Sequence, residues 1–445
     1  MALTRTNTQK LFDRAKKVMP YGVNSNFRYW GDDKTHVFVR GEKCYVFDAD
    51  ENRYIDYRLG FGPVILGHGY PAVVERMTRA LKDGGVYAAT HPLEIIVAER
   101  IARMTGMDKV RLVNSGTEAT MHALRIARAH TNREKFIKFE GAYHGMHDNV
   151  LFSTSMSLSR TFGSRRSPVQ VASGSGIPRA LNEYVITLPF NDPEMLHKTL
   201  QAKWGDIAAI LIEPIMGNAA SLMPEPGFLQ TIRRLCDEYG IVMIMDEVKT
   251  GFRIANGGAQ EYFGVKADLA TYAKAMANGY PLAAIAGMDE VMSVIEPGKI
   301  SLGGTYCGNI PGTAATDATL EILEKQDILG SIGLRGERLK KGIDQILDEA
   351  DLPHVVMGPP QMFGFFIGSH KVPRDYRDLV AGADIEFYEK FAFEMIDRGV
   401  MPEPDNREPW FLCYEHTDAV VDETLNIFQD ALTATLSKHS PHLIQ

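Results

Sequence analysis

The strongest constraint on the fold is a pair of short apolar runs, IAAILI (207–212) and IVMIM (241–245), each of which is followed directly by an acidic residue. Runs of this length without a polar residue are typical of parallel strands that helices cover on both faces. The segment between them spaces Phe228, Ile232 and Leu235 at helical intervals and then reaches a glycine. Together these segments predict a β-α-β unit and therefore an α/β fold.

The pattern changes toward the C-terminus, where longer amphipathic stretches (332–352 and 384–399) alternate with strand-like segments (362–367 and 410–414). This change predicts a smaller α+β domain at the end of the chain. Near the start, residues 37–56 predict a β-hairpin. The pattern leaves open whether that hairpin packs on the C-terminal domain.

Charge and cysteine content narrow the function classes. The chain has 48 Lys+Arg and 56 Asp+Glu, a net charge of −8, which disfavours nucleic acids and anionic membranes as main partners. The four cysteines (Cys44, Cys236, Cys307 and Cys413) form no CxxC pair, so neither a disulfide framework nor a thiolate zinc site is indicated. No stretch approaches the ~18 apolar residues of a membrane span. We expect a cytoplasmic protein that acts on small molecules.

A strand-turn-helix pattern near residue 115 suits phosphate binding. Residues 111–113 predict a strand, and 117–130 predict a helix. Ser115, Gly116 and Thr117 at the bend offer backbone N–H groups, hydroxyls and the positive end of a helix. The alternative is an ordinary helix cap, and the tripeptide alone does not decide between the two.

Two further residues follow apolar strands directly. Asp246 comes after 241–245, so it should stand at the carboxyl edge of the sheet, where open α/β folds bind ligands; strand-end capping is the alternative. Lys274 follows the apolar segment 268–273, and lysines are rarely buried without a partner or a task. A phosphate site, a carboxylate and a half-buried lysine together are what pyridoxal 5'-phosphate (PLP) requires.

Six ordered motifs resemble those of class III aminotransferases of PLP fold type I. They are NSGTEA (114–119), FEGAYHG (139–145), EPIMGN (213–218), DEVKTGFR (246–253), TYAKAMANGYP (271–281) and GGTYCGN (303–309). Within that class, residues 21–425 most resemble the glutamate-1-semialdehyde 2,1-aminomutase-like branch. The resemblance implies a large PLP-binding domain over 66–319 with a mostly parallel sheet. It also implies a small domain that residues 1–65 and 320–445 build together.

The resemblance also implies roles for individual residues. Lys274 matches the family's Schiff-base lysine, and Asp246 matches the aspartate that pairs with the pyridine nitrogen. The segment 115–117 matches the phosphate-binding turn. Tyr143 and Val248 match the residues on the two faces of the cofactor ring.

One implied contact crosses between subunits. Thr305 matches a threonine that reaches the phosphate of the neighbouring subunit, which implies a homodimer with shared active sites. The implied substrates are a small-molecule amino donor and a carbonyl acceptor.

Substrate residues are less constrained. Class III enzymes that alternate between ω-amines and keto acids carry a glutamate where this chain has Asn218, and its absence matches the aminomutase-like branch. Arg28 aligns with that branch's carboxylate-binding arginine, and its planar fork suits the role; a surface arginine is the alternative. Glu408 aligns with a substrate-binding glutamate in an uncertain register. Residues 275–278 and Tyr306-Cys307 depart from the branch and indicate a reshaped pocket.

Two other patterns could suggest a metal site or a nucleotide-binding loop, but neither is predicted here. His144 and His147 lie three apart without further spaced ligands, so we do not predict a metal site. The segment 173–178 is glycine-rich but lacks the strand-to-helix context of a nucleotide loop, and we expect a mobile linker over the active site. Three hypotheses remain: an aminotransferase, a glutamate-1-semialdehyde aminomutase, and a non-catalytic scaffold of the same fold.

Overall fold

The computed structural model describes residues 3–441, and its main feature in that range is a seven-stranded sheet. Its strands are β4 (Lys109–Val113), β5 (Lys135–Phe139), β8 (Val185–Leu188), β9 (Ile207–Ile212), β10 (Val242–Asp246), β11 (Leu269–Tyr272) and β12 (Ala283–Gly287). Their order is β4-β12-β11-β10-β9-β5-β8. Strand β12 runs antiparallel to both of its neighbours, and the other strand pairs are parallel. The fold is therefore the predicted α/β fold with a mostly parallel sheet.

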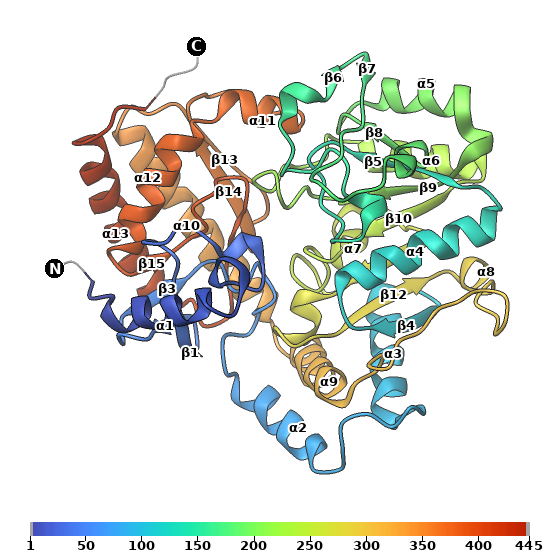
Figure 1. Cartoon of the computed structure of the whole chain (residues 1–445), viewed down its shortest axis with the longest axis horizontal. Helices are drawn as coiled ribbons and strands as arrows, with labels where there is room; N and C mark the ends of the chain where they lie inside the picture. Colours follow the sequence, from blue (N-terminus) through green and yellow to red (C-terminus); the bar gives the residue numbers. More distant parts are fainter. Residues whose placement is uncertain (1–2, 442–445) are drawn as a thin grey trace.

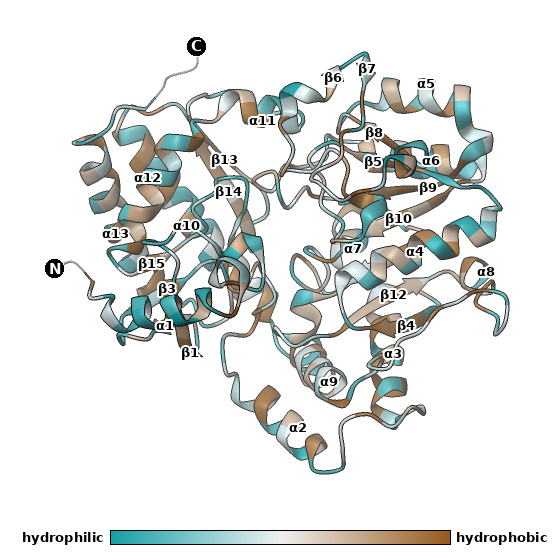
Figure 2. Cartoon of the chain, in the orientation of Figure 1, coloured by the Kyte–Doolittle hydropathy of each residue, from teal (hydrophilic) through white to brown (hydrophobic). Residues whose placement is uncertain are grey.

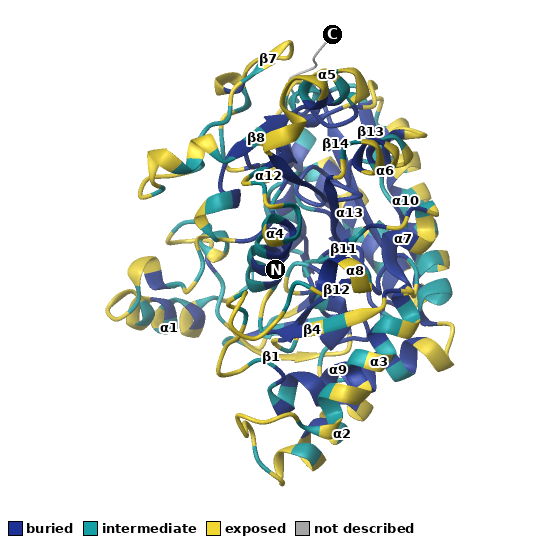
Figure 3. Cartoon of the chain, turned by 90° about the vertical axis from the view of Figure 1, so that its right-hand side faces the viewer, coloured by how far each residue is buried: buried dark blue, intermediate teal, exposed yellow. Residues whose placement is uncertain are grey.

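The predicted β-α-β unit is confirmed by β9, α6 (Phe228–Tyr239) and β10. Alternate residues of β9 serve the two faces of the sheet: Ala209 and Leu211 pack in the core beneath α4 (Gly116–Thr131), and Ile210 and Ile212 pack in the core that contains α6. Strands β9, β10, β11 and β12 are consequently mostly apolar (Figure 2) and buried along their whole length. The edge strand β4, by contrast, is partly exposed (Figure 3). Burial on both faces is the reason that the run of β9 contains no polar residue.

Helices from the middle of the chain surround this sheet or extend beside it (Figure 1). They are α2 (Pro71–Leu81), α3 (Pro92–Thr105), α4, α5 (Pro193–Lys203), α6, α7 (Gly258–Phe263), α8 (Asp289–Met292) and α9 (Ile310–Lys325). Helix α9 packs against both α2 and α3. A short hairpin, β6 (Gly163–Ser164) and β7 (Ser167–Pro168), projects from the long connection between β5 and β8.

The two ends of the chain share a second sheet, with strand order β1-β2-β3-β15. These strands are β1 (Phe38–Glu42), β2 (Tyr45–Asp48), β3 (Arg53–Asp56) and β15 (Val400–Met401). Val400 pairs with Ile55, so the N-terminal strands pack on the C-terminal part, and Figure 1 shows the blue and orange-red segments side by side. The predicted hairpin is in fact three antiparallel strands, because β1 adds to β2.

The rest of the C-terminal part consists of a small sheet and four helices, joined by α1 (Thr6–Lys16) from the N-terminus. Its elements are β13 (His354–Met357), β14 (Met362–Ile367), β16 (Trp410–Phe411), α10 (Ile328–Glu349), α11 (Tyr376–Gly382), α12 (Ile385–Ile396) and α13 (Asp418–Leu436). The domain limits at 65 and 319 stay a prediction, and residues 1–2 and 442–445 of the predicted ranges lie outside the described residues.

The predicted strand at 410–414 is shorter than expected, because β16 ends at Phe411. The chain turns away after it: the Leu412 carbonyl accepts from Arg253 at 2.9 Å, and the Tyr414 N–H donates to the Ile65 carbonyl at 2.9 Å. These long-range bonds replace a sheet ladder. Between residues 3 and 441, no helix is both long and apolar enough to cross a membrane.

Candidate active site

Lys274 occupies a strained turn at the carboxyl end of β11. It begins the short 3₁₀ helix Lys274–Ala277, and its φ of +49° lies in the left-handed region that favours glycine. Asn278 anchors this turn, accepting from the Leu66 N–H at 2.9 Å and donating to the Gly67 carbonyl at 3.1 Å. The Lys274 amine has no hydrogen-bond or ion-pair partner in the described part of the chain. Burial, followed by the nearby Lys249 ammonium, lowers its pKa to about 7.

Asp246 ends β10 and is braced by three donors. Its Oδ1 accepts from the Thr271 hydroxyl at 2.9 Å and from the Val248 N–H at 3.1 Å, and its Oδ2 lies 2.7 Å from Nδ1 of His144. The Asp246 side chain is 3% exposed. Its neighbour Glu247 faces the other way and accepts from the first N–H groups of α7. His144, whose ring lies against the Asp246 carboxylate, was not predicted from the sequence as its partner.

Lys274 and Asp246 meet in a cavity with two adjoining chambers. The inner chamber, about 190 Å³, is lined by Gly116, Thr117, Tyr143, His144, Gly145, Glu213, Asp246, Val248, Lys249, Ala273 and Lys274. The outer chamber, about 490 Å³, is lined by Asn24–Arg28, Gly60, Phe61, Tyr143, Met146, Met156, Asn218, Lys249, Lys274 and Glu408. Tyr143, Lys249 and Lys274 belong to both chambers.

The predicted phosphate turn lies at the start of α4, and its three residues behave differently. Ser115 caps the helix, with its hydroxyl accepting from the Glu118 N–H at 3.2 Å, and its side chain does not line either chamber. Gly116 and Thr117 do line the inner chamber. A Cβ on Gly116 would lie 3.1 Å from both methyl groups of Val248, so a side chain there would press on the opposing wall. One turn therefore both caps α4, through Ser115, and lines the inner chamber, through Gly116 and Thr117.

The three predicted substrate residues occupy the outer chamber. Asn218 donates its amide hydrogen to one oxygen of Glu408, and Lys249 lies 2.8 Å from the other oxygen. Arg28 is exposed, and its guanidinium has no hydrogen-bond or ion-pair partner among residues 3–441. It also borders a neighbouring cavity that contains His68 and Tyr280. The structure thus places Glu408 in the outer chamber, and its match to the family's substrate-binding glutamate stays a prediction. The chamber also contains Lys249, which was not predicted although it lies three residues after Asp246.

Thr305 does not line either chamber. It borders a separate cavity of about 410 Å³, together with Val86, Tyr87 and Cys307. Tyr306 beside it is 63% exposed. Within one chain, therefore, the departures at Tyr306 and Cys307 do not shape the cavity around Lys274.

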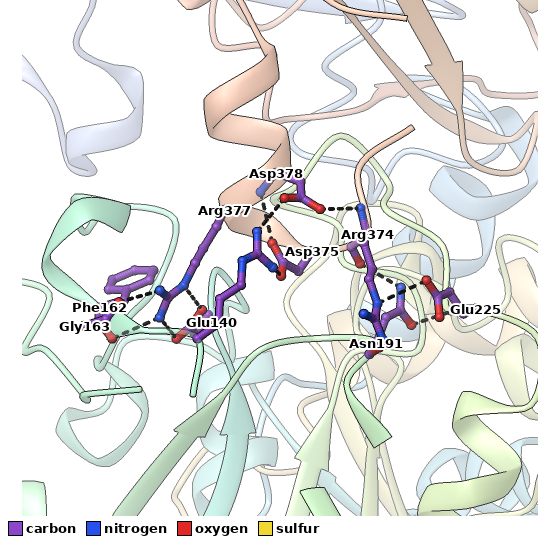
Figure 4. Close-up of polar contacts among 10 residues, drawn as sticks. Glu140, Phe162, Gly163, Asn191, Glu225, Arg374, Asp375, Arg377 and Asp378 are labelled. Atoms are coloured by element: carbon purple, nitrogen blue, oxygen red, sulfur yellow. Dashed lines mark hydrogen bonds and ion pairs between the residues drawn. The ribbon is translucent and has the colours of Figure 1, made fainter. Parts of the chain in front are cut away.

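Hydrogen bonds and an ion pair from α11 anchor the connection between β5 and β8 (Figure 4). Arg377 makes two bonds to the fully buried Glu140, at 2.6 and 2.7 Å, and also donates to the Phe162 carbonyl at 2.9 Å. Tyr376 donates to the carbonyl of Ser155, next to Met156 in the outer chamber. These contacts fix one wall of the chamber to the C-terminal part. The predicted mobility of 173–178 stays a prediction.

The two histidines that raised the question of a metal are both engaged in other contacts. His144 pairs with Asp246, and Nε2 of His147 lies 3.3 Å from the Thr120 hydroxyl. Within the described residues, no three His, Cys, Asp or Glu side chains are grouped as metal ligands.

Comparison with known proteins identifies the class. Residues 29–432 match the model of the family "Aminotransferase class-III". A glutamate-1-semialdehyde 2,1-aminomutase of Methanopyrus kandleri is 39% identical over 425 residues, covering 95% of this chain and 96% of that protein. Among solved structures, an omega-transaminase from Sphaerobacter thermophilus superimposes with a TM-score of 0.88 at 31% identity, covering 96% of this chain and 98% of the other. A transaminase with PLP bound gives 0.87 at 27% identity, covering 98% and 99%.

The chain belongs to the class III aminotransferase family, and its cofactor is PLP. The inner chamber fits this group on its own chemistry. Gly116 and the N-terminus of α4 leave room and backbone N–H groups for a phosphate. Asp246 offers a fixed carboxylate, and Lys274 offers an amine whose pKa burial lowers to about 7, so that a substantial fraction is neutral near pH 7.

Proposed function

We propose that this protein is an aminotransferase, which moves an amino group from an amino acid or amine to a keto acid or aldehyde. The observation that carries the proposal is the unpartnered Lys274 amine, with a pKa lowered to about 7, in one chamber with the braced carboxylate of Asp246. When bound, PLP joins amines through an imine and withdraws electrons from the adjacent carbon. In the ping-pong order, the donor leaves as a carbonyl compound before the acceptor binds.

Each proposed residue acts through its own chemistry. Lys274 supplies the neutral amine that holds the cofactor covalently and, when released, carries the proton between two carbons. Asp246, oriented by His144 and Thr271, holds the proton on the ring nitrogen. Tyr143 and Val248 enclose the ring. In the outer chamber, the guanidinium of Arg28 has no partner among the described residues and would bind a substrate carboxylate bidentately.

Glutamate-1-semialdehyde 2,1-aminomutase activity is the second candidate, supported by the 39% identity to a protein of that name. One experiment separates the two. We expect the amino donor alone to bleach the visible absorbance of the holoenzyme and then stall after one half-reaction, with turnover resuming when a keto acid is added. Complete conversion of glutamate 1-semialdehyde without any keto acid would instead support the aminomutase.

We also propose that two chains share each active site. The support is the position of Thr305, which lies outside the chambers of its own chain, and the exposed apolar side chains nearby, which include Val86, Tyr87 and Tyr306. An exposed apolar group of this kind is typical of an interface. In such a dimer Thr305 would bind the phosphate held by the partner's Gly116–Thr117 turn.

Thr305→Val tests this arrangement. The substitution removes one hydrogen bond from the Thr305 hydroxyl to the charged phosphate. Its loss should weaken PLP binding by about 1.5–3 kcal/mol, which is roughly ten- to a hundred-fold in affinity. The measurement is a PLP titration of the visible absorbance. Mixed dimers give the control: chains with Lys274→Ala combined with chains with Thr305→Val place both defects in one site and leave the other intact. Mixtures that recover no activity at limiting PLP would exclude the shared site.

A further inference from the structure

A second lysine, Lys249, lies beside Lys274 at the junction of the two chambers. Its side chain is only 7% exposed, and its Nζ is 2.8 Å from Oε2 of Glu408. The space for its stem exists because residue 217 is glycine: a Cβ there would lie 2.1 Å from Cδ of Lys249. The ammonium is therefore in a defined position inside the cavity, not on a solvent-exposed arm.

Glu408 is held just as firmly. One of its oxygens accepts from the amide of the buried Asn218, and the other pairs with Lys249. A buried ion pair contributes little to stability because desolvation offsets the attraction between its charges. An effect on the chemistry of the site is a better explanation for two opposite charges placed here.

We propose that Lys249 and Glu408 set the proton affinity of the Lys274 nitrogen in opposite directions, Lys249 lowering it and Glu408 raising it. Both side chains line the outer chamber with Lys274 and are largely buried, and charges on buried groups act more strongly on a neighbouring group than charges in water do. Lys249 is the foremost charged group that lowers the pKa of Lys274, and Glu408 is the foremost one that raises it.

The consequence concerns catalysis near neutral pH. A protonated amine can neither attack a carbonyl carbon nor accept a proton, so the Lys249 charge enlarges the competent fraction of Lys274. Glu408 limits this effect, which keeps the nitrogen basic enough to act as a proton acceptor. The other titratable or charged groups around the chambers are Asp246, Glu213, His144, Tyr143 and Arg28.

The test is a pH titration of the purified full-length holoenzyme, read from the visible absorbance of the Lys274–cofactor linkage. This inference rests on the proposed function, because the linkage must exist to be read. In Lys249→Met, the titration midpoint should rise by about one pH unit, since a neighbouring cation is lost. In Glu408→Gln, it should fall. The double variant should return toward the wild-type midpoint.

The opposite signs are what distinguish electrostatics from structural damage. If Lys249→Met does not fold, Lys249→Gln, which keeps a polar chain of similar length, should give the same upward shift. Midpoints that coincide in all variants, or that move in one direction, would overturn the inference. A wild-type holoenzyme without any such absorbance would instead overturn the proposed function.

Discussion

Lys274→Ala should lower turnover by about 10⁴-fold or more, because it removes both the nucleophile and the proton carrier. The protein should still fold and bind some PLP non-covalently, since Asp246, Gly116 and Thr117 are unchanged in the inner chamber. The measurements are steady-state turnover and borohydride reduction followed by peptide mass analysis. Reduction should fix the cofactor to the peptide of Lys274 in the wild type and to no peptide in the variant.

Lys249→Met is the matched control, because it removes a lysine from the same two chambers. It should keep the reducible linkage and part of its turnover, with a shifted pH profile. If borohydride marks Lys249 or another lysine in the wild type, the assignment of Lys274 is wrong.

Asp246→Asn should lower kcat by about 10²–10³-fold while changing PLP affinity much less. The asparagine has the same size and its oxygen can still accept from Thr271 and Val248, but it lacks the charge that keeps the ring nitrogen protonated. That charge matters most in the transition state, where electrons flow into the ring. The measurement compares kcat with the PLP dissociation constant.

Glu247→Gln is the control for this substitution. Glu247 is the adjacent buried carboxylate, but it binds Thr250 and the first N–H groups of α7 and does not line either chamber. Its loss should affect stability more than kcat. A near-normal kcat in Asp246→Asn would contradict the role of Asp246.

The sequence pattern was sufficient to predict features that depend on a single helix or strand. The apolar runs at 207–212 and 241–245 had to be buried strands, because no exposed element carries such a composition. The carboxyl ends of parallel strands meet at one edge of a sheet, so the position of Asp246 followed from its place in the sequence. Lys274 followed in the same way, since β11 lies next to β10. The β-α-β unit and the positions of Asp246 and Lys274 at the end of their strands were therefore predictable from local pattern, whereas the mostly parallel sheet was implied by the family resemblance.

Contacts between distant segments were not predictable from pattern. Lys249 and Glu408 are 159 residues apart, and His144 and Asp246 are 102 apart. The spacing of apolar residues shows which face of a helix or strand is buried. It does not show which loop, from elsewhere in the chain, packs over that face.

The sequence by itself thus determined that the apolar runs are buried strands and which residues stand at their ends, because these features depend on neighbours along the chain. Only the tertiary structure decided that β15 pairs with β3, that Glu408 is held between Asn218 and Lys249, and that Thr305 lies outside the chambers of its own chain. The physical reason is that these contacts join segments far apart in the chain. They depend on how the sheets and helices pack against each other in three dimensions, which the local sequence pattern does not show.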